Sequence, residues 1–454
     1  MIEIDIFDIF HNVIDYKCDR KISFNKASID SRTVRVSDIF FGIKGEHLDG
    51  NFFAHEALSK GAGLTVLDNK EAYKQVKDNK ILVNSSIDSL KELGSYILSV
   101  FDGEKIIITG SVGKTSTKEI LSAVLSKGKN IYRSYKNYNN ELGVSISCSN
   151  IDLTASVAIF EIGTSNKGEI ENLARYIGPD TAIITNIGYS HIGNFSNFKE
   201  LAYEKFSVVK AMRSGTLWIN SDFKNLFDRV VEGLNKEINI KTFGINHNAD
   251  IYISSTGISG IGTTYSVEYK EQSYDFCIRH FYQHYAINSL PCIALALARG
   301  IQHADISDAL EDFDSLDGRG EIIIQDNLTL IDDTYNAPFE SIISAIRNFS
   351  RLGDGDKVAI IGSMAEIDGY EKMLYGKIVE EAMNNKTINF IFCGEEYLKF
   401  NESSNIKIRK TKEETIELVK DLRAAFILVK AARVNRFEDI IDSIKNNAEI
   451  KDAI

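Results

Sequence analysis

Apolar and polar positions alternate along the middle of the chain in a strand-and-helix rhythm. The apolar runs at 105–109 and 181–186 are typical of strands that are buried on both faces of a parallel sheet. Longer segments between such runs carry apolar residues at helical spacing. The full series predicts strands over 105–109, 155–161, 181–186 and 215–219, and helices over 86–100, 115–127, 167–176 and 197–212. This order predicts a doubly wound parallel sheet.

The flanking segments have different patterns. Residues 1–84 predict short strands and one helix, with strands over 38–43 and 64–67 and the helix over 53–60. The polar stretch 240–280 has apolar residues at alternate positions, which predicts antiparallel strands before an apolar helix over 286–301. After residues 318–320 a third αβ unit begins, with strands near 328–332, 357–361, 389–393 and 425–429. We therefore expect an α/β protein with a small N-terminal domain (1–84), a central domain (85–316) and a Rossmann-like C-terminal domain (317–454).

Length and composition agree with this organisation. A chain of 454 residues is long enough for roughly three domains at about 150 residues each. The net charge of −12 leaves no broad basic face, so we expect no nucleic-acid partner. The five cysteines show no C-x-x-C spacing, which argues against a disulfide framework or a zinc site and favours a reducing compartment. Because polar residues interrupt the apolar segment 286–301, we expect no membrane insertion. We expect a cytoplasmic protein that is a monomer.

The segment 106–116 carries the strongest chemical signal. A β-branched run enters Thr109-Gly110-Ser111-Val112-Gly113-Lys114-Thr115-Ser116, and helical spacing follows. The two glycines allow backbone N–H groups to face an anion, to which the helix N-terminus adds its positive end. Lys114 would then reach the β- and γ-phosphates, and the Thr115 hydroxyl would bind Mg²⁺. Because residue 108 is Ile, the usual G-x-x-x-x-G-K-[ST] spacing is not met, and an ordinary glycine-rich turn would also explain the segment.

Polar residues recur where the predicted strands end. Glu161 ends one strand, Thr185 and Asn186 end the next, and His191 follows. Side chains at the carboxyl ends of parallel strands can converge on one ligand. Mg²⁺ prefers oxygen ligands, and Glu161 is placed to act beside Thr115. Taken singly, such a Glu is usually a solvated charge and such a His a surface or core residue.

Four segments, 109–115, 137–144, 161–163 and 185–191, resemble the central domain of the Mur ligases, the ATP-dependent amide-forming enzymes of peptidoglycan synthesis. The resemblance extends over nearly the whole chain. Segments 30–34, 40–45 and 49–53 are similar to the nucleotide-sugar domain of the family, and 318–319, 330–337 and 427–430 to its C-terminal domain, which in the family receives the incoming amine. It is nearest to the members that add D-alanyl-D-alanine to UDP-muramoyl tripeptide.

The resemblance implies ATP and two Mg²⁺ ions as cofactors, with Lys205 as a carbamylated metal ligand. Lys114, Lys205, His191 and Arg319 would be catalytic. The implied contacts are Gly110, Ser111, Gly113, Lys114, Thr115, Ser116 and Arg319 for the phosphates; His284 and Asn288 for adenine; Asp333 for ribose; Thr115, Glu161, His191 and Lys205 for metal; and Ser31, Arg32, Asp49, Asn139, Asn140, Thr164 and Asn336 for the substrates.

The implied reaction explains this set of residues. ATP would convert an acceptor carboxylate into an acyl phosphate, and an amine would then displace phosphate. Lys114 and Arg319 would neutralise charge on the transferred phosphoryl group. Because water would hydrolyse an acyl phosphate, and because the ligands come from two domains, we expect the domains to close on ATP.

Several positions depart from the pattern of the D-alanyl-D-alanine-adding members. Pro338-Phe339 stands where they have Asn-Pro, Gly362-Ser363-Met364 where they have Gly-Asp-Met, Lys430-Ala431-Ala432-Arg433 where they have Lys-Gly-Ser-Arg, Tyr285 where they have Asn, and Asn51 where they have His. A paralogue that joins a different amino compound to a nucleotide-sugar or peptide carboxylate therefore stays open. A P-loop NTPase without ligase activity and a non-catalytic binding module also stay open. A folylpolyglutamate-type ligase shares the central domain, but the block Asp30-Ser31-Arg32 has no place in it.

Overall fold

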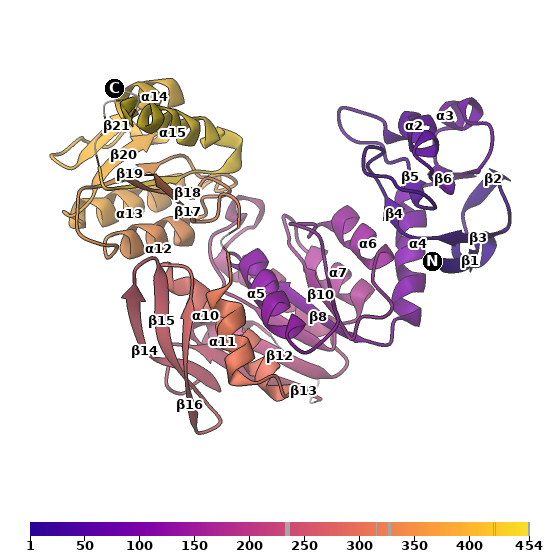
Figure 1. The fold of residues 1–454 in the computed structure, drawn as a ribbon, viewed down its shortest axis with the longest axis horizontal. Coiled ribbons are helices and arrows are strands. Elements are labelled where there is room, and N and C mark those ends of the chain that lie inside the picture. Colours follow the sequence, from indigo (N-terminus) through magenta and orange to yellow (C-terminus); the bar gives the residue numbers. More distant parts are fainter. Residues whose placement is uncertain (232–236, 315, 326–327, 421, 423, 453–454) are drawn as a thin grey trace. The chain divides into compact units, whose positions relative to one another are not determined.

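The computed structural model describes residues 1–231, 237–314, 316–325, 328–420, 422 and 424–452 (Figure 1). In this part of the chain, three larger sheets of five, nine and six strands carry the fold, beside a two-stranded sheet. Contacts divide the chain into two compact units. The first unit comprises Met1–Ile107, Lys129–Gly163 and Glu171–Thr181, and the second unit comprises Ile108–Gly128, Thr164–Ile170 and Ala182–Ile454.

The five-stranded sheet lies in the first unit. Its order is β2-β7-β6-β5-β4, in which β4 to β7 pair in parallel and β2 is antiparallel to β7. The strands are β2 (Val13–Lys17), β4 (Ala27–Ser28), β5 (Ile39–Phe41), β6 (Leu64–Leu67) and β7 (Lys80–Val83), and β1 (Ile2–Asp5) pairs with β3 (Lys21–Phe24). The predicted helix is α2 (Ala54–Ser59), and the structure adds the short helices α1 (Ile6–Ile9) and α3 (Lys70–Gln75), so the expectation of one helix was wrong.

The rest of the first unit begins with α4 (Ser86–Val100), whose bounds match the prediction. Ser85 caps this helix by accepting a hydrogen bond from the Asp88 N–H. Its buried face packs against α6 (Glu141–Ser149). The strands β9 (Ile131–Arg133) and β10 (Val157–Glu161) pair in parallel, and α7 (Glu169–Ile177) follows β10.

The largest sheet has nine strands in the order β16-β15-β14-β13-β12-β11-β8-β10-β9. The predicted strands are confirmed as β8 (Glu104–Thr109), β11 (Thr181–Ile184) and β12 (Gly215–Asn220), and their buried residues agree with strands covered on both faces. The antiparallel expectation for 240–280 is confirmed for β14 (Ile251–Ser259), β15 (Gly262–Tyr269) and β16 (Gln272–Ile278). It was wrong for β13 (Ile238–Gly244), which pairs in parallel with both neighbours.

Helices of the second unit pack around its part of this sheet. The helix α5 (Lys114–Ser126) contacts α10 (Gln283–Ala298) and α11 (His303–Glu311), and α10 holds Pro291 within the helix. The predicted helix over 197–212 is α8 (Phe198–Phe206) followed by a 3₁₀ turn over Ser207–Ala211, and α9 (Lys224–Val230) follows β12.

The six-stranded sheet follows in the second unit with the order β17-β18-β22-β19-β20-β21. Its strands are β17 (Glu321–Gln325), β18 (Leu328–Asp333), β19 (Lys357–Ile361), β20 (Asn389–Cys393), β21 (Ile406–Arg409) and β22 (Phe426–Lys430), all parallel except β17. Four of them were predicted. The helices α12 (Phe339–Phe349) and α13 (Glu371–Asn384) lie on one face, and α14 (Lys412–Val419) and α15 (Glu438–Asp452) lie on the other (Figure 1).

The three sheets agree with the predicted α/β class, whereas the boundaries at 84 and 316 stay predictions because the two compact units divide the chain elsewhere. Within the described residues, every helix is too short or too polar to cross a membrane.

Candidate nucleotide and metal site

The predicted phosphate loop is a tight turn between β8 and α5. Gly110 has φ 141° and Gly113 has φ 84°, both in the region that favours glycine. A Cβ atom on Gly110 would lie 2.1 Å from the Thr185 hydroxyl oxygen, and one on Gly113 would lie 2.5 Å from Asn288 Nδ2. Both glycines are therefore required by backbone conformation and by space.

The segment after β11 holds this loop in shape. The Val112 N–H donates to Asn186 Oδ1 at 2.9 Å, and the Thr185 hydroxyl donates to the Val112 carbonyl at 2.6 Å. The Ser111 hydroxyl donates to the Gly188 carbonyl at 3.1 Å and accepts the Gly188 N–H at 2.7 Å. Thr185 and Asn186, which the sequence placed at a strand end, thus shape the loop before any ligand arrives.

Lys114 lies over the same turn. Its Nζ donates to the carbonyl oxygens of Gly110 at 2.9 Å and Ser111 at 3.3 Å. Thr115 and Ser116 are buried at the start of α5. A lysine and a hydroxyl at the N-terminus of a buried helix form an arrangement suited to phosphate and Mg²⁺.

Lys205 is 1% exposed near the end of α8. Burial, followed by the charge of Lys114, lowers the pKa of Lys205 to about 7, against the opposing charges of Glu204 and Glu340. A large fraction of this amine is therefore neutral near pH 7. The adjacent Glu204 has both oxygens bound, since Oε2 accepts the Gly168 N–H at 2.6 Å and Oε1 accepts the Ile170 N–H at 2.8 Å.

His191 meets a carboxylate from the segment that follows β19. Its Nδ1 contacts the carboxylate of Glu366, and the Gly193 N–H donates to the Glu366 carbonyl at 3.1 Å. Burial lowers the pKa of His191, opposed by Glu366 and reinforced by Lys205 and Lys114. This shift favours the neutral imidazole, which is the form that ligates metals.

Residues from β18 and β22 form a buried ion pair. Oδ2 of Asp333 accepts from the Lys430 ammonium at 2.7 Å and from the Tyr282 hydroxyl at 3.1 Å. Lys430 also donates to the Asn336 carbonyl at 3.1 Å. Arg319 stacks on the ring of Tyr335, with its Cζ 3.8 Å from the ring centroid.

The predicted adenine residues lie on α10. His284 is stacked beside Tyr282, its Nδ1 lies 3.3 Å from the Ser344 hydroxyl, and burial lowers the pKa of His284 to about 3. Asn288 lies against Gly113 of the loop. Tyr285, a departure from the family pattern, stacks on a buried histidine, and its hydroxyl donates to the Arg319 carbonyl at 2.9 Å. This substitution therefore joins α10 to Arg319 through the core.

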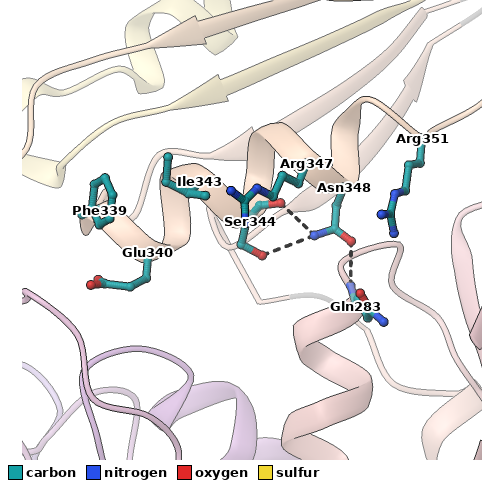
Figure 2. Close-up of a pocket in the computed structure, with 8 residues that line it drawn as sticks. All are labelled: Gln283, Phe339, Glu340, Ile343, Ser344, Arg347, Asn348 and Arg351. Carbon is teal, nitrogen blue, oxygen red and sulfur yellow. Dashed lines mark hydrogen bonds between the residues drawn. The ribbon is translucent and has the colours of Figure 1, made fainter. Parts of the chain in front are cut away.

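A cavity of about 490 Å³ lies between α12 and Gln283 at the start of α10 (Figure 2). Asn348 closes one side, because its Oδ1 accepts the Gln283 N–H at 3.0 Å and its Nδ2 donates to the Ser344 carbonyl at 2.7 Å. Figure 2 shows Glu340 at one end of this row of side chains and Arg351 at the other. Through Ser344 the cavity adjoins His284.

Glu161 and its neighbours belong to the first unit. Glu161 is buried at the end of β10 and accepts from Asn139 Nδ2 at 2.8 Å. Asn140 caps α6 through the Gly143 N–H at 2.9 Å. Asn139 therefore orients Glu161, while Asn140 has a structural role in addition to the substrate role that the resemblance implies.

The residues expected to bind the nucleotide sugar also lie in the first unit. Ser31 donates to Glu56 at 2.8 Å, and Arg32 pairs with Asp30 at 2.8 Å in an exposed position. Asp49 accepts from Asn51 Nδ2 at 2.7 Å. Asn51, where relatives have histidine, is 1% exposed and also donates to Asp68, so this departure is part of a buried network.

The second unit thus contains Lys114, Thr115, His191, Lys205 and Arg319, and the charge of Lys114 acts on both His191 and Lys205. It also contains Thr164, whose hydroxyl lies 3.3 Å from Glu204. Among the described residues, no three side chains of His, Cys, Asp or Glu are grouped closely enough to hold a metal ion. Thr115, His191 and Lys205 fit Mg²⁺ only if further oxygen ligands are present, because Mg²⁺ prefers oxygen. A carbamate on Lys205 would supply two such oxygens.

Two contributors were missed by the sequence reasoning. Glu340 of α12 and Glu366 lie beside Tyr189 and His191 respectively, although neither is near its partner in the sequence. Only their place close to the departing positions Phe339 and Ser363 could have drawn notice.

Comparison with known proteins agrees with this architecture. The Mur ligase middle domain matches residues 108–296, and the Mur ligase glutamate ligase domain matches residues 318–442. The chain is similar to three UDP-N-acetylmuramoyl-tripeptide–D-alanyl-D-alanine ligases. Its sequence identity is 26% to the ligase of Borreliella burgdorferi (the alignment covers 93% of this chain and 94% of the relative), 28% to that of Buchnera aphidicola (95% and 94%) and 26% to that of Bacillus subtilis (91% and 92%).

Solved structures show the same fold. MurF from Acinetobacter baumannii superposes with a TM-score of 0.84 at 22% identity, covering 97% of each chain. The MurF ligase from Thermotoga maritima in complex with ADP gives a TM-score of 0.80 at 24% identity, covering 94% of this chain and 98% of that one. Taken with the preformed phosphate loop, these matches establish that the chain belongs to the Mur ligase family of ATP-dependent amide ligases.

Proposed function

We propose that this protein adds D-alanyl-D-alanine to UDP-N-acetylmuramoyl-tripeptide in the cytoplasm, as a monomer, through an acyl-phosphate intermediate. The observation that supports it most is a deeply buried Lys205 under the electrostatic influence of Lys114 in a preformed phosphate loop. The relatives that match nearly the full length carry this activity in their names.

The phosphate side of the reaction would use residues of the second unit. Lys114 binds the β- and γ-phosphates, and Arg319 neutralises charge on the transferred phosphoryl group. Ser111, Gly110, Gly113 and Ser116 shape the loop, while His284 and Asn288 face the adenine and Asp333 the ribose.

Mg²⁺ would neutralise phosphate charge when it is bound. Thr115 and Glu161 would hold one ion, and His191 and Lys205 a second. Lys205 can fill this role because its neutral amine can attack CO₂: an N–C bond forms as one C–O π bond opens, one proton is released to solvent, and the neutral amine becomes an anionic ligand. The pKa of about 7 makes that reaction accessible near neutral pH.

The substrates would approach from other surfaces. Ser31, Arg32 and Asp49 would contact the nucleotide sugar within a domain of residues 1–84. Asn139, Asn140 and Thr164 would line the path of the peptide in a central domain of residues 85–316. Asn336 would contact substrate from a C-terminal domain of residues 317–454, which would carry the incoming amine.

The experiment is direct: Mg-ATP, UDP-muramoyl tripeptide and a panel of amines are incubated with the protein, and products are identified by mass. We expect an amide with D-alanyl-D-alanine and one phosphate per bond, and no product with Lys114→Ala. An amide with a different amine would identify a paralogue, in keeping with the changed residues Ala431 and Ala432. Phosphate release at the same rate with and without the acid and the amine would indicate an NTPase instead.

A further inference from the structure

Glu340 is a half-buried residue whose carboxylate has one oxygen engaged and one not. Its Oε1 accepts the Tyr189 N–H at 2.8 Å. Its Oε2 is buried and makes no hydrogen bond within the described part of the chain. An unsatisfied carboxylate oxygen is costly to bury, so this oxygen calls for a partner that binds there.

The surroundings hold Glu340 in place. A Cβ atom on Gly188 would lie 2.4 Å from the Glu340 carboxyl carbon, so glycine is needed for this approach. The preceding residue, Phe339, packs edge-on against Tyr189 with ring centroids 6.1 Å apart. Tyr189 also contacts the rings of Phe198 and Tyr370. The carboxylate is therefore fixed in one orientation.

Among the acids near Lys205 and His191, Glu340 has a carboxylate oxygen that can still accept a hydrogen bond. The two acids whose charges act on Lys205 are Glu204 and Glu340, and both oxygens of Glu204 accept hydrogen bonds. Glu366 is in contact with His191. Among these three acids of the described chain, Glu340 therefore combines closeness to Lys205 with an oxygen that can accept from a ligand.

The described lining of the cavity sets one carboxylate, Glu340, beside two arginines, Arg347 and Arg351. Glu340 is the sole carboxylate among the described residues that line it, and the others are apolar, neutral polar or basic (Figure 2). A divalent cation requires several oxygen ligands, whereas an ammonium group can be recognised by one charge-assisted hydrogen bond.

We propose that the Glu340 carboxylate is the receptor for the ammonium group of the incoming amine, an amino acid or short peptide. The inference rests on the proposed function and adds the residue that places the attacking nitrogen. Glu340 orients that nitrogen beside the site of phosphoryl transfer, and the ammonium passes one proton to this carboxylate before its nitrogen attacks the acyl phosphate and phosphate leaves. Tyr189 fixes the carboxylate through its backbone N–H.

The test separates the two half-reactions. In the wild type and in Glu340→Gln, acyl-phosphate formation without amine is measured by reductive trapping, and the KM for D-alanyl-D-alanine is measured in the full reaction. We expect Glu340→Gln to raise the KM for the amine about tenfold to a hundredfold and to leave acyl-phosphate formation within about twofold. Glu340→Asp should restore part of the affinity, and the exposed Glu380→Gln should change neither quantity.

A neutral nucleophile adds a readout that a merely structural role would not produce. Hydroxylamine is uncharged at neutral pH, so its rate of trapping should be the same in Glu340→Gln as in the wild type. An unchanged KM for the amine, or an equal loss with hydroxylamine, would overturn the inference while the wild-type activity stands. A wild type that forms no acyl phosphate and no amide would instead overturn the proposed function itself. Thermal melts of each variant distinguish loss of fold from loss of binding.

Discussion

Nδ1 of His191 lies against a carboxylate oxygen of Glu366, and both residues adopt left-handed backbone conformations, at φ 64° and 57°. Neither is a glycine, so each conformation is held by its surroundings at some energetic cost. The Gly193 N–H reinforces the contact by donating to the Glu366 carbonyl. The six-stranded part of the second unit thereby fixes the orientation of a proposed metal ligand.

Glu366→Gln should loosen the orientation of His191 while a side chain of nearly the same size still fills the position. We expect about a tenfold to hundredfold loss in metal affinity or activity, with most of the activity recovered at high Mg²⁺. Two measurements test this loss: activity is titrated against Mg²⁺, and Mn²⁺ binding is followed by electron paramagnetic resonance. The exposed Glu380→Gln is the matched control. Identical metal titrations for Glu366→Gln and the wild type would show that the contact does not position His191.

Lys205→Met should abolish amide-bond formation and raise the stability of the folded protein. Because the pKa of Lys205 is lowered to about 7 in the folded state from a usual value of 10.5, the wild type is penalised by the buried charge in full below pH 7. That penalty fades as pH rises from 7 towards 10.5. The gain in melting temperature should therefore be larger at pH 6 than at pH 9. Lys199→Met, at an exposed position of the same helix, should show no such dependence.

The proposed carbamate gives Lys205 a second signature. Because CO₂ reacts with the neutral amine, a ¹³C resonance from labelled bicarbonate should be present at pH 8 and lost as pH falls below about 7. The resonance should be missing from Lys205→Met. A wild type that stays fully active in rigorously CO₂-free buffer, and shows no such resonance, would contradict the carbamate.

Gly113→Ala should damage the phosphate loop in two ways. The left-handed φ of 84° is strained for alanine, and the new Cβ would meet Asn288 at 2.5 Å. We expect a loss of about 1–3 kcal/mol in unfolding free energy and a loss of nucleotide binding, measured by denaturant unfolding and by calorimetry. Gly376→Ala in α13 is the control, because no atom lies within 4 Å of its added Cβ, and it should be neutral or stabilising by about 0.5–1 kcal/mol. Equal effects at both glycines would refute the argument.

Lys430→Met should leave the Asp333 carboxylate buried without its cation. Breaking one partner of a buried pair costs about 3–5 kcal/mol, which equilibrium unfolding can measure. Adding Asp333→Asn should recover part of that loss, since the uncompensated charge is then gone. Additive losses in the double variant would mean that the pair at 2.7 Å contributes no coupling.

The comparison between sequence and structure is clearest at the departures from the family pattern. Tyr285 and Asn51 raised doubt about substrates when only the sequence was considered, yet both are buried members of polar or stacked networks. The strands β17 and β21 were not predicted, because they lie at the two edges of their sheet and carry partly exposed residues. Edge strands have weak apolar patterns and depend on a neighbour for their register.

Local patterns were enough to predict the glycine turn at 110–113, the bounds of α4 and β6, and the alternation of strands and helices, because glycine requirements and apolar periodicity are local properties. Three pairings appear only in the folded chain: Tyr189 anchors Glu340, Glu366 meets His191, and the charge of Lys114 acts on the buried Lys205. These pairings join residues far apart in the chain, and their energies arise from burial and charge that exist only once the sheets have packed.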